Sequence, residues 1–155
     1  IRLCDWSSDV CSSDLVDDAF PGSAVEVDIA GGRFEIGLRQ PGMARALAAA
    51  ELSDGTLRYL LWVAALLSPR PAELTVLNEP EASLHPDLLP ALAALIVRAA
   101  EGSQIVVVTH SAALVAALGD LDDEASMLRL VKTDGETKVA GQGPLDEPAW
   151  HWPDR

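Results

Sequence analysis

The chain has 155 residues, of which 49% are hydrophobic and 23% charged, and its formal net charge is −13 at pH 7. This composition supports one domain with a hydrophobic core and excludes a mainly disordered chain. The acidic excess also excludes a broad basic face, because binding to nucleic-acid phosphates requires clustered Lys and Arg. The apolar runs at 60–67 and 88–100 are shorter than the roughly 20 residues that span a bilayer, so we expect no membrane segment.

The first fifteen residues differ in character from the rest. Cys4–Leu15 resembles the translation of a common sequencing-adapter oligonucleotide, so we expect residues 1–15 to be an artefact. The alternative is an ordinary terminus rich in Ser and Asp. Without the artefact, the authentic chain is a truncated one that begins in mid-sequence at Val16 and contains no cysteine. An acidic chain without cysteine fits a cytoplasmic protein.

The next part of the chain carries a hairpin pattern and then a helix. Alternating apolar and polar residues over 24–29 and 33–38 predict two antiparallel strands joined by a tight turn. The Ala-rich residues 43–51 fit either a short helix or a connecting loop. Ser53–Gly55 supply capping chemistry for a helix over 56–67. The free amides at this helix start either form an ordinary N-cap or hold an anion, which the helix dipole favours.

Two apolar strands, at 73–77 and 104–108, flank a helix predicted over 87–100. Both strands are of the kind that is buried on both faces of a parallel sheet. A strand, helix and strand in this order form a βαβ crossover, which brings the carboxyl ends of the strands to one edge. Glu79 and His110 follow these strand ends, at the edge where open α/β sheets bind ligands.

Each polar residue near these strand ends has more than one interpretation. Glu79 is either a general base or a surface carboxylate, and His110 either contacts a γ-phosphate or is an ordinary sheet-edge residue. Glu81 either orients a metal-bound water or is simply solvated, and we expect it to be solvated. His85 is expected to cap the helix that follows it.

The carboxyl-terminal part is predicted to contain a helix over 112–118 and a closing hairpin. The hairpin strands are expected at 127–132 and 136–140, around the turn residues Thr133-Asp134-Gly135. The tail at 144–153, with Trp150, His151 and Trp152, is expected to be irregular.

Taken in this order, the motifs resemble those of the AAA-family ATPases of the ABC type, related to RecF-like and chromosome-maintenance proteins. Leu52–Arg58 resembles the signature motif and Leu74–Glu79 the Walker B motif. Ser83–Pro86 resembles the D-loop, and Thr109–Ser111 the switch histidine. The resemblance implies an α/β fold of the P-loop NTPase class. The chain would be the carboxyl-terminal half of an ABC-type head, with a parallel βαβ core flanked by helices and β-hairpins.

The resemblance also implies ATP binding and hydrolysis, with ATP and Mg²⁺ held between two heads. Glu79 would polarise the attacking water, His110 would sense the γ-phosphate, and Asn78 would hold the metal ion. The residues implied in nucleotide binding or in communication across the interface are Ser53, Gly55, Arg58, Ser83 and His85. The implied partner is a second ATPase head, as a homodimer, with DNA or an effector nuclease as further candidates and no membrane.

The chain departs from the family pattern at two points. No Gly-x-x-x-x-Gly-Lys-Ser/Thr motif is present, so we expect the Walker A motif upstream in the complete protein and an inactive fragment here. Asn78 also stands where Walker B ordinarily has Asp, which predicts weaker Mg²⁺ binding and slow turnover. Two alternatives stay open. One is a non-catalytic, ATP-dependent dimerisation switch, and the other is the ATPase subunit of a DNA-repair or phage-defence assembly.

Overall fold

The computed structural model describes residues 12–30, 32–123 and 125–141. It divides into two compact units, the first ending at Asp123 and the second beginning at Glu124. The irregular tail expected at 144–153, with its tryptophans and His151, lies outside the described residues. Among the described helices, none combines the length and the apolar character that crossing a membrane requires.

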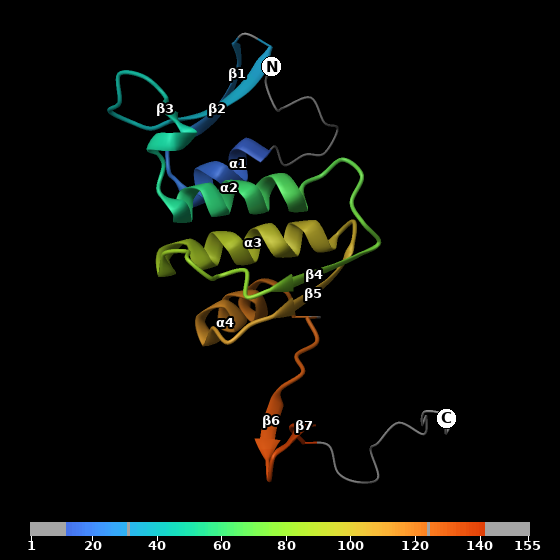
Figure 1. The fold of residues 1–155 in the computed structure, drawn as a ribbon. Helices are drawn as coiled ribbons and strands as arrows, with labels where there is room; N and C mark the ends of the chain where they lie inside the picture. The colour runs from blue at the N-terminus through green and yellow to red at the C-terminus, as the bar shows by residue number, and fades with distance from the viewer. Residues whose placement is uncertain (1–11, 31, 124, 142–155) are drawn as a thin grey trace. The chain divides into compact units, whose positions relative to one another are not determined.

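The first unit begins with a helix and three successive strands, after which helices and strands alternate along the chain (Figure 1). Its elements are α1 Ser12–Ala19, β1 Ala24–Ala30, β2 Arg33–Arg39, β3 Leu47–Ala48, the 3₁₀ helix η1 Ala49–Glu51, α2 Asp54–Leu66, β4 Leu74–Asn78, the 3₁₀ helix η2 Pro86–Leu88, α3 Leu89–Ala100, β5 Gln104–Val108 and α4 Ala112–Leu121. The second unit consists of β6 Leu130–Thr133 and β7 Glu136–Val139.

The amino-terminal sheet has the order β1-β2-β3 and is antiparallel. Its first two strands confirm the predicted hairpin. The third strand was not predicted, since 43–51 was expected to be a helix or a loop, and it forms because Leu47 pairs with Leu38 across the sheet. Glu51 stabilises the turn into η1 by accepting hydrogen bonds from Arg45 and from the Ala48 amide. The Arg45 bond, with the Ala48 bond adding to it, lowers the pKa of Glu51 to about 2.

The helices α1, α2 and α3 pack around one apolar core (Figure 1). Tyr59 of α2 is fully buried in this core, where its hydroxyl donates a 2.8 Å hydrogen bond to the carbonyl of Leu15. Its ring meets the edge of Phe20 with centroids 5.6 Å apart. Helix α1 was not predicted, and its Leu15 and Val16 are core residues. The origin of residues 1–15 as an adapter artefact stays a prediction.

Tyr59→Phe is expected to weaken the fold and to remove one source of its alkaline sensitivity. Burial, with the charge of Asp18 adding to it, raises the pKa of Tyr59 from 10.0 to about 12. Below the pKa that Tyr59 has in the unfolded chain, the folded and the unfolded states both keep the phenol proton, so the contribution of Tyr59 to stability is complete. The contribution is lost as pH rises from 10 through 12. Losing the hydroxyl should cost about 1 kcal/mol near neutral pH. Urea unfolding of both proteins at rising pH tests this, and parallel stability curves would contradict it.

Strands β4 and β5 are joined by α3 and pair in parallel, with Val76 opposite Val106, which confirms the predicted βαβ crossover. The expected burial of both faces is wrong for the described residues. Leu77 is 2% exposed on the face that joins the core, whereas its neighbour Val76 is 59% exposed on the other face. Exposed apolar side chains cover that second face, which we call the open sheet face: Leu74, Val76, Val106 and Val108.

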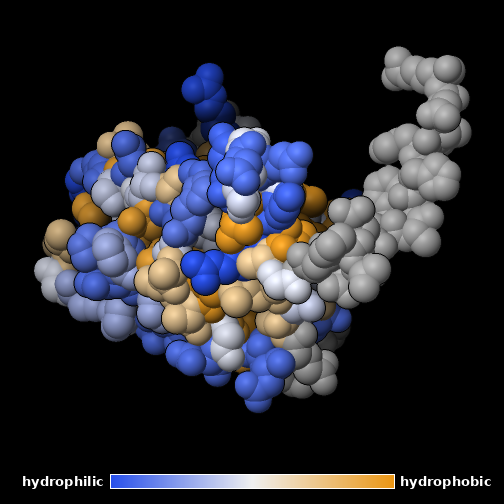
Figure 2. Space-filling model, turned by 90° about the horizontal axis from the view of Figure 1, so that it is seen from below, coloured by the Kyte–Doolittle hydropathy of each residue, from blue (hydrophilic) through white to orange (hydrophobic). Residues whose placement is uncertain are grey.

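The open sheet face has a simple structural cause. Helix α3 packs on one side of the two-stranded sheet, and α4 packs mainly against α3. Seen from below, the surface of the molecule shows hydrophobic residues between hydrophilic ones (Figure 2). Since parallel sheets normally have both faces covered, an apolar face of this kind is typical of a surface that another segment or a partner covers.

The remaining helices follow the predictions with shifted ends. Helix α2 begins two residues earlier than predicted, with Ser53 as its N-cap. The helix predicted over 87–100 consists of η2 followed by α3, and α4 extends to Leu121. In the second unit the predicted hairpin is confirmed but shorter. Its turn has positive φ at Asp134 (52°) and Gly135 (88°), as a two-residue hairpin turn requires.

Candidate functional site

The strand β4 delivers Asn78 and Glu79 to the carboxyl edge of the parallel sheet. Asn78 is the last strand residue, opposite Val108. The amide of Glu79 extends the ladder with a 2.7 Å bond to the carbonyl of Val108, and the chain then turns away with φ of 45° at Glu79. A left-handed conformation is uncommon for a residue with a side chain, and residues in strained backbone conformations cluster at functional sites.

The strand β5 brings His110 to the same edge, beside Glu79. The Nε2 atom of His110 lies 3.5 Å from Oε1 of Glu79, and the two side chains are 88% and 48% exposed. The predicted approach of the two strand ends is therefore observed, although the roles of these residues stay predictions. A pair this open to solvent adds little to stability.

A second contact between the strand ends lies next to this pair and was not predicted. The hydroxyl of Thr109 donates a hydrogen bond to Oε1 of Glu81 and accepts a 2.9 Å bond from the Ser111 amide. The other carboxylate oxygen of Glu81 is buried and has no hydrogen-bond partner among the described residues. The expectation that Glu81 is solvated is wrong, because the turn after β4 folds back over the end of β5.

The amino end of α2 carries the residues assigned to nucleotide binding. Ser53 caps the helix, since its hydroxyl accepts a 3.1 Å bond from the Thr56 amide. Gly55 allows a close approach: a Cβ atom at this position would lie 3.1 Å from the carbonyl oxygen of Ser83. Arg58, one turn later, is exposed and forms no ion pair within the described part of the chain. The helix start therefore lies against the turn that resembles the D-loop.

Two further contacts hold the segment 80–87, which contains that turn, residues 83–86. His85 accepts a 3.3 Å bond at Nδ1 from the Asp87 amide, which confirms its predicted capping role. The indole of Trp62 on α2 donates a 3.0 Å bond to the carbonyl of Pro80. Sequence analysis missed this Trp62 contact. The one available signal was a tryptophan in an otherwise aliphatic stretch of the helix, because a buried indole N–H usually finds a partner.

Substitutions at Ser83 are expected to change stability in opposite directions. Ser83 has φ of 66°, a conformation that costs residues with a Cβ atom roughly 1–2 kcal/mol and glycine almost nothing. Ser83→Gly should therefore leave the melting temperature unchanged or raise it, whereas Ser83→Val should lower it. Thermal unfolding of both variants measures this. A Val variant as stable as the Gly variant would show that the turn is not held in this conformation in solution.

The chemistry available at the strand ends suits a phosphate and a divalent cation. The carboxylate of Glu79 can accept a proton from water, and the amide oxygen of Asn78 is a ligand that Mg²⁺ accepts. The first amides of α2 are of the kind that bind anions. No group of three or more His, Cys, Asp and Glu side chains that could hold a metal ion occurs in residues 12–30, 32–123 and 125–141. These donors thus fit a metal ion only when phosphate oxygens and water complete its coordination.

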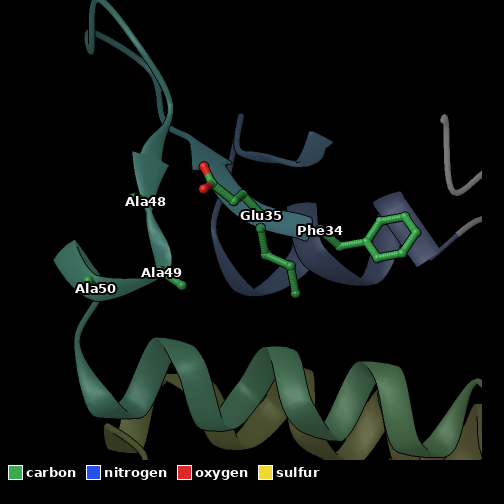
Figure 3. Close-up of a pocket in the computed structure, with 6 residues that line it drawn as sticks. Phe34, Glu35, Ala48, Ala49 and Ala50 are labelled. Atoms are coloured by element: carbon green, nitrogen blue, oxygen red, sulfur yellow. The ribbon is translucent and has the colours of Figure 1, made fainter. Parts of the chain in front are cut away.

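A shallow hollow elsewhere on the first unit does not belong to this site. It lies between β2 and η1 and is lined by Phe34, Glu35, Ile36 and Ala48–Ala50 (Figure 3). Glu35 is its one titratable side chain. None of the residues that follow the two parallel strands takes part in it, so the hollow brings no second reactive group together with Glu35.

Solved structures of SMC ATPase heads are similar to this chain. A structure from work on ATP-driven dimerization and DNA stimulated activation of SMC ATPases matches with a TM-score of 0.64 and 18% identity, over 87% of this chain and 83% of that one. An SMC head bound to the C-winged helix domain of ScpA matches with a TM-score of 0.62 and 19% identity, over 83% of this chain and 40% of that one. The SMC head domain from Thermotoga maritima matches with a TM-score of 0.59 and 20% identity, over 83% of this chain and 44% of that one. The chain thus spans less than half of the latter two.

The likeness to these heads places the fold in the P-loop NTPase class, as an α/β fold of the ATPase-head type. The sequence profile of the family described as "AAA domain, putative AbiEii toxin, Type IV TA system" matches residues 7–116, more than half of the chain. The chain therefore belongs to this family of AAA ATPases, which confirms the resemblance inferred from its motifs. A comparison with curated proteins finds no significant match.

Proposed function

We propose that the chain contributes to ATP binding and hydrolysis as the carboxyl-terminal part of an ATPase head that works as a dimer. The observation that carries this proposal is the juxtaposition of Glu79 and His110, 3.5 Å apart at the ends of neighbouring parallel strands, in a chain of the AAA ATPase family. A carboxylate and an imidazole at this edge suit the positioning of water beside a phosphoryl group.

Each candidate residue has a distinct role in the proposal. Glu79 accepts the proton of the attacking water, and His110 donates a hydrogen bond to the phosphoryl oxygens. Asn78 orients the metal ion through its amide oxygen. Bound ATP and Mg²⁺ supply the transferable phosphoryl group and the charge that offsets its negative oxygens.

The residues at the start of α2 and those in the D-loop turn have different roles in the proposal. Ser53 and Gly55 at the start of α2 contact the nucleotide of a second head, and Arg58 offsets the charge of Asp54. Ser83 and His85 transmit the state of one nucleotide to the other. The contact of Gly55 with the Ser83 backbone supports this coupling, because a shift of the turn must move the helix start.

The open sheet face supports the further proposal that 16–155 is one part of a larger head. Val76 and Val106 lie uncovered on a parallel sheet with two strands, whereas parallel sheets normally have both faces covered. We propose that a half carrying the phosphate loop covers this face in the complete head. The fragment alone would then lack the lysine and the main phosphate cradle and would be inactive.

Asn78→Asp in the complete head is expected to strengthen Mg²⁺ binding and to raise kcat. Asn78 lies at the strand end beside Glu79 and has no negative charge of its own, whereas a carboxylate attracts the cation directly. The Mg²⁺ concentration that gives half-maximal hydrolysis should fall by about tenfold, the equivalent of roughly 1.4 kcal/mol. Titrating Mg²⁺ against the ATPase rate of both proteins measures this. Identical curves would mean that Asn78 does not face the metal ion.

The proposed function itself is tested by measuring ATP turnover and dimerisation together in the complete protein. ATP-dependent dimers with steady turnover support a hydrolysing head. Dimers that form with ATP but never release phosphate would instead support the non-catalytic switch. A protein that neither binds ATP nor dimerises would contradict both.

A role in phage defence is the second candidate. The description of the matched family names a putative toxin of a type IV toxin–antitoxin system, which makes a toxin role part of this candidate. An effector nuclease or DNA would be the partner in such an assembly. The chain itself has a net charge of −13, so a DNA-binding surface would belong to another segment or subunit. Toxicity of the complete protein in a host, relieved by a co-expressed neighbouring gene product, would support this candidate.

A further inference from the structure

The contact between Glu81 and Thr109 joins the two turns that carry the candidate catalytic residues. Glu81 lies two residues after Glu79, and Thr109 immediately precedes His110. The Ser111 amide must donate to the Thr109 hydroxyl, so the single hydroxyl hydrogen is directed to the carboxylate of Glu81. The bond is thus charge-assisted and has a defined direction.

The Thr109 bonds also continue into α4. Ser111 donates its amide to Thr109, and its own hydroxyl caps α4 by accepting a 3.2 Å bond from the Leu114 amide. His110 stands between the two bonded residues with an 88% exposed side chain, so no packing of its own holds it in place. Its position depends on its neighbours on either side, and Thr109 is tied to Glu81.

The position of the Glu81 side chain is not explained by a gain in stability. One of its carboxylate oxygens is buried and unpartnered among the described residues, and burying such an oxygen is unfavourable. The position of Glu81 is therefore better explained by the hydrogen bond that its other carboxylate oxygen accepts. That oxygen connects the end of β4 to the end of β5.

We infer that Glu81 is a positioning residue, which acts through Thr109 to hold His110 at its place beside Glu79. Glu81 contacts neither water nor nucleotide in this scheme. It sets the distance between the two side chains that do, and so fixes the geometry for phosphoryl transfer. The inference rests on the proposed hydrolysis for its consequence, but the Glu81–Thr109 contact is a property of the chain alone.

The test compares three variants of the complete head. Glu81→Leu removes the acceptor, Thr109→Val removes the hydroxyl at nearly constant volume, and Glu81→Gln keeps an acceptor oxygen. The first two should each lower kcat by about 10- to 100-fold, as a misplaced group does, with KM for ATP unchanged. The double variant should be no slower than the slower single one, and Glu81→Gln should retain most of the rate. Glu73→Leu, an exposed glutamate before β4, is the matched control.

Amide hydrogen exchange gives a second readout that needs no ATPase activity. The Ser111 amide should exchange faster in Glu81→Leu and Thr109→Val than in the wild type, whereas the Leu57 amide in α2 should not change. If the wild type fails to hydrolyse ATP, the proposed function fails, and the exchange of Ser111 still tests the contact. Unchanged Ser111 exchange, or a normal kcat in either variant of an active protein, would overturn the inference. A melting temperature that falls in proportion to kcat would also overturn it, since that would indicate a structural role.

Discussion

Replacing Glu79 by glutamine in the complete ATPase head is expected to lower kcat for ATP hydrolysis by at least about 100-fold. Glutamine has the same shape and can still hold a water molecule, but it cannot accept the proton that the water must lose. Glu79 lies at the sheet edge beside His110, with about half of its side chain open to solvent. ATP binding does not depend on this proton transfer, so KM should change little and ATP-driven dimers should persist for longer than in the wild type.

A control for this substitution is available on the same strand. Glu73 is exposed and precedes β4 at its opposite end. Its backbone carbonyl accepts a bond from the Gln104 amide, and its side chain forms no ion pair within the described part of the chain. Glu73→Gln removes the same charge without touching the strand tip, so it should leave kcat unchanged. Steady-state phosphate release and size-exclusion chromatography with ATP measure both effects. A Glu79→Gln protein that hydrolyses ATP at the wild-type rate would remove Glu79 from the mechanism.

The sequence predicted those parts of the fold that depend on local patterns. The hairpin of β1 and β2 follows from alternating residues around a glycine turn, and the β4–α3–β5 crossover follows from two apolar runs around a helix. Strand β3 was missed because its pairing with β2 is a non-local contact that an Ala-rich segment does not signal. The prediction that β4 and β5 are buried on both faces was wrong for a similar reason. An apolar strand shows what it can bury, but whether its second face is covered depends on other segments.

The site shows the same division between local and non-local information. The order of residues after each strand predicted that Glu79 and His110 meet, because parallel strands present their carboxyl ends together. The Glu81–Thr109 contact was missed, since it depends on how the turn after β4 folds back. The role of Gly55 was also only partly foreseen. A side chain at position 55 would come too close to the carbonyl oxygen of Ser83, and this packing reason cannot be read from a sequence motif.

The open sheet face leads to the second large effect, which compares neighbouring residues on opposite faces of β4. Leu77→Asp places a charge in the core, where the side chain is 2% exposed, and should destabilise the chain by about 3–5 kcal/mol, enough to unfold it. Val76→Asp places the same charge where the side chain is 59% exposed. In the chain as given, it should change the free energy of unfolding by less than about 0.5 kcal/mol.

The two variants should behave alike only when the second face is covered. In a complete head, where we propose that the phosphate-loop half packs on the open sheet face, Val76→Asp would bury a charge and should abolish cooperative folding, as Leu77→Asp does. Urea unfolding of each variant in the fragment and in the complete protein gives the four values needed. If Val76→Asp is harmless in both, the open sheet face is a solvent surface and the head is completed elsewhere. If it is harmless only in the fragment, the exposed valines of β4 and β5 are one half of a core, and the inactivity expected of this chain alone has a structural cause.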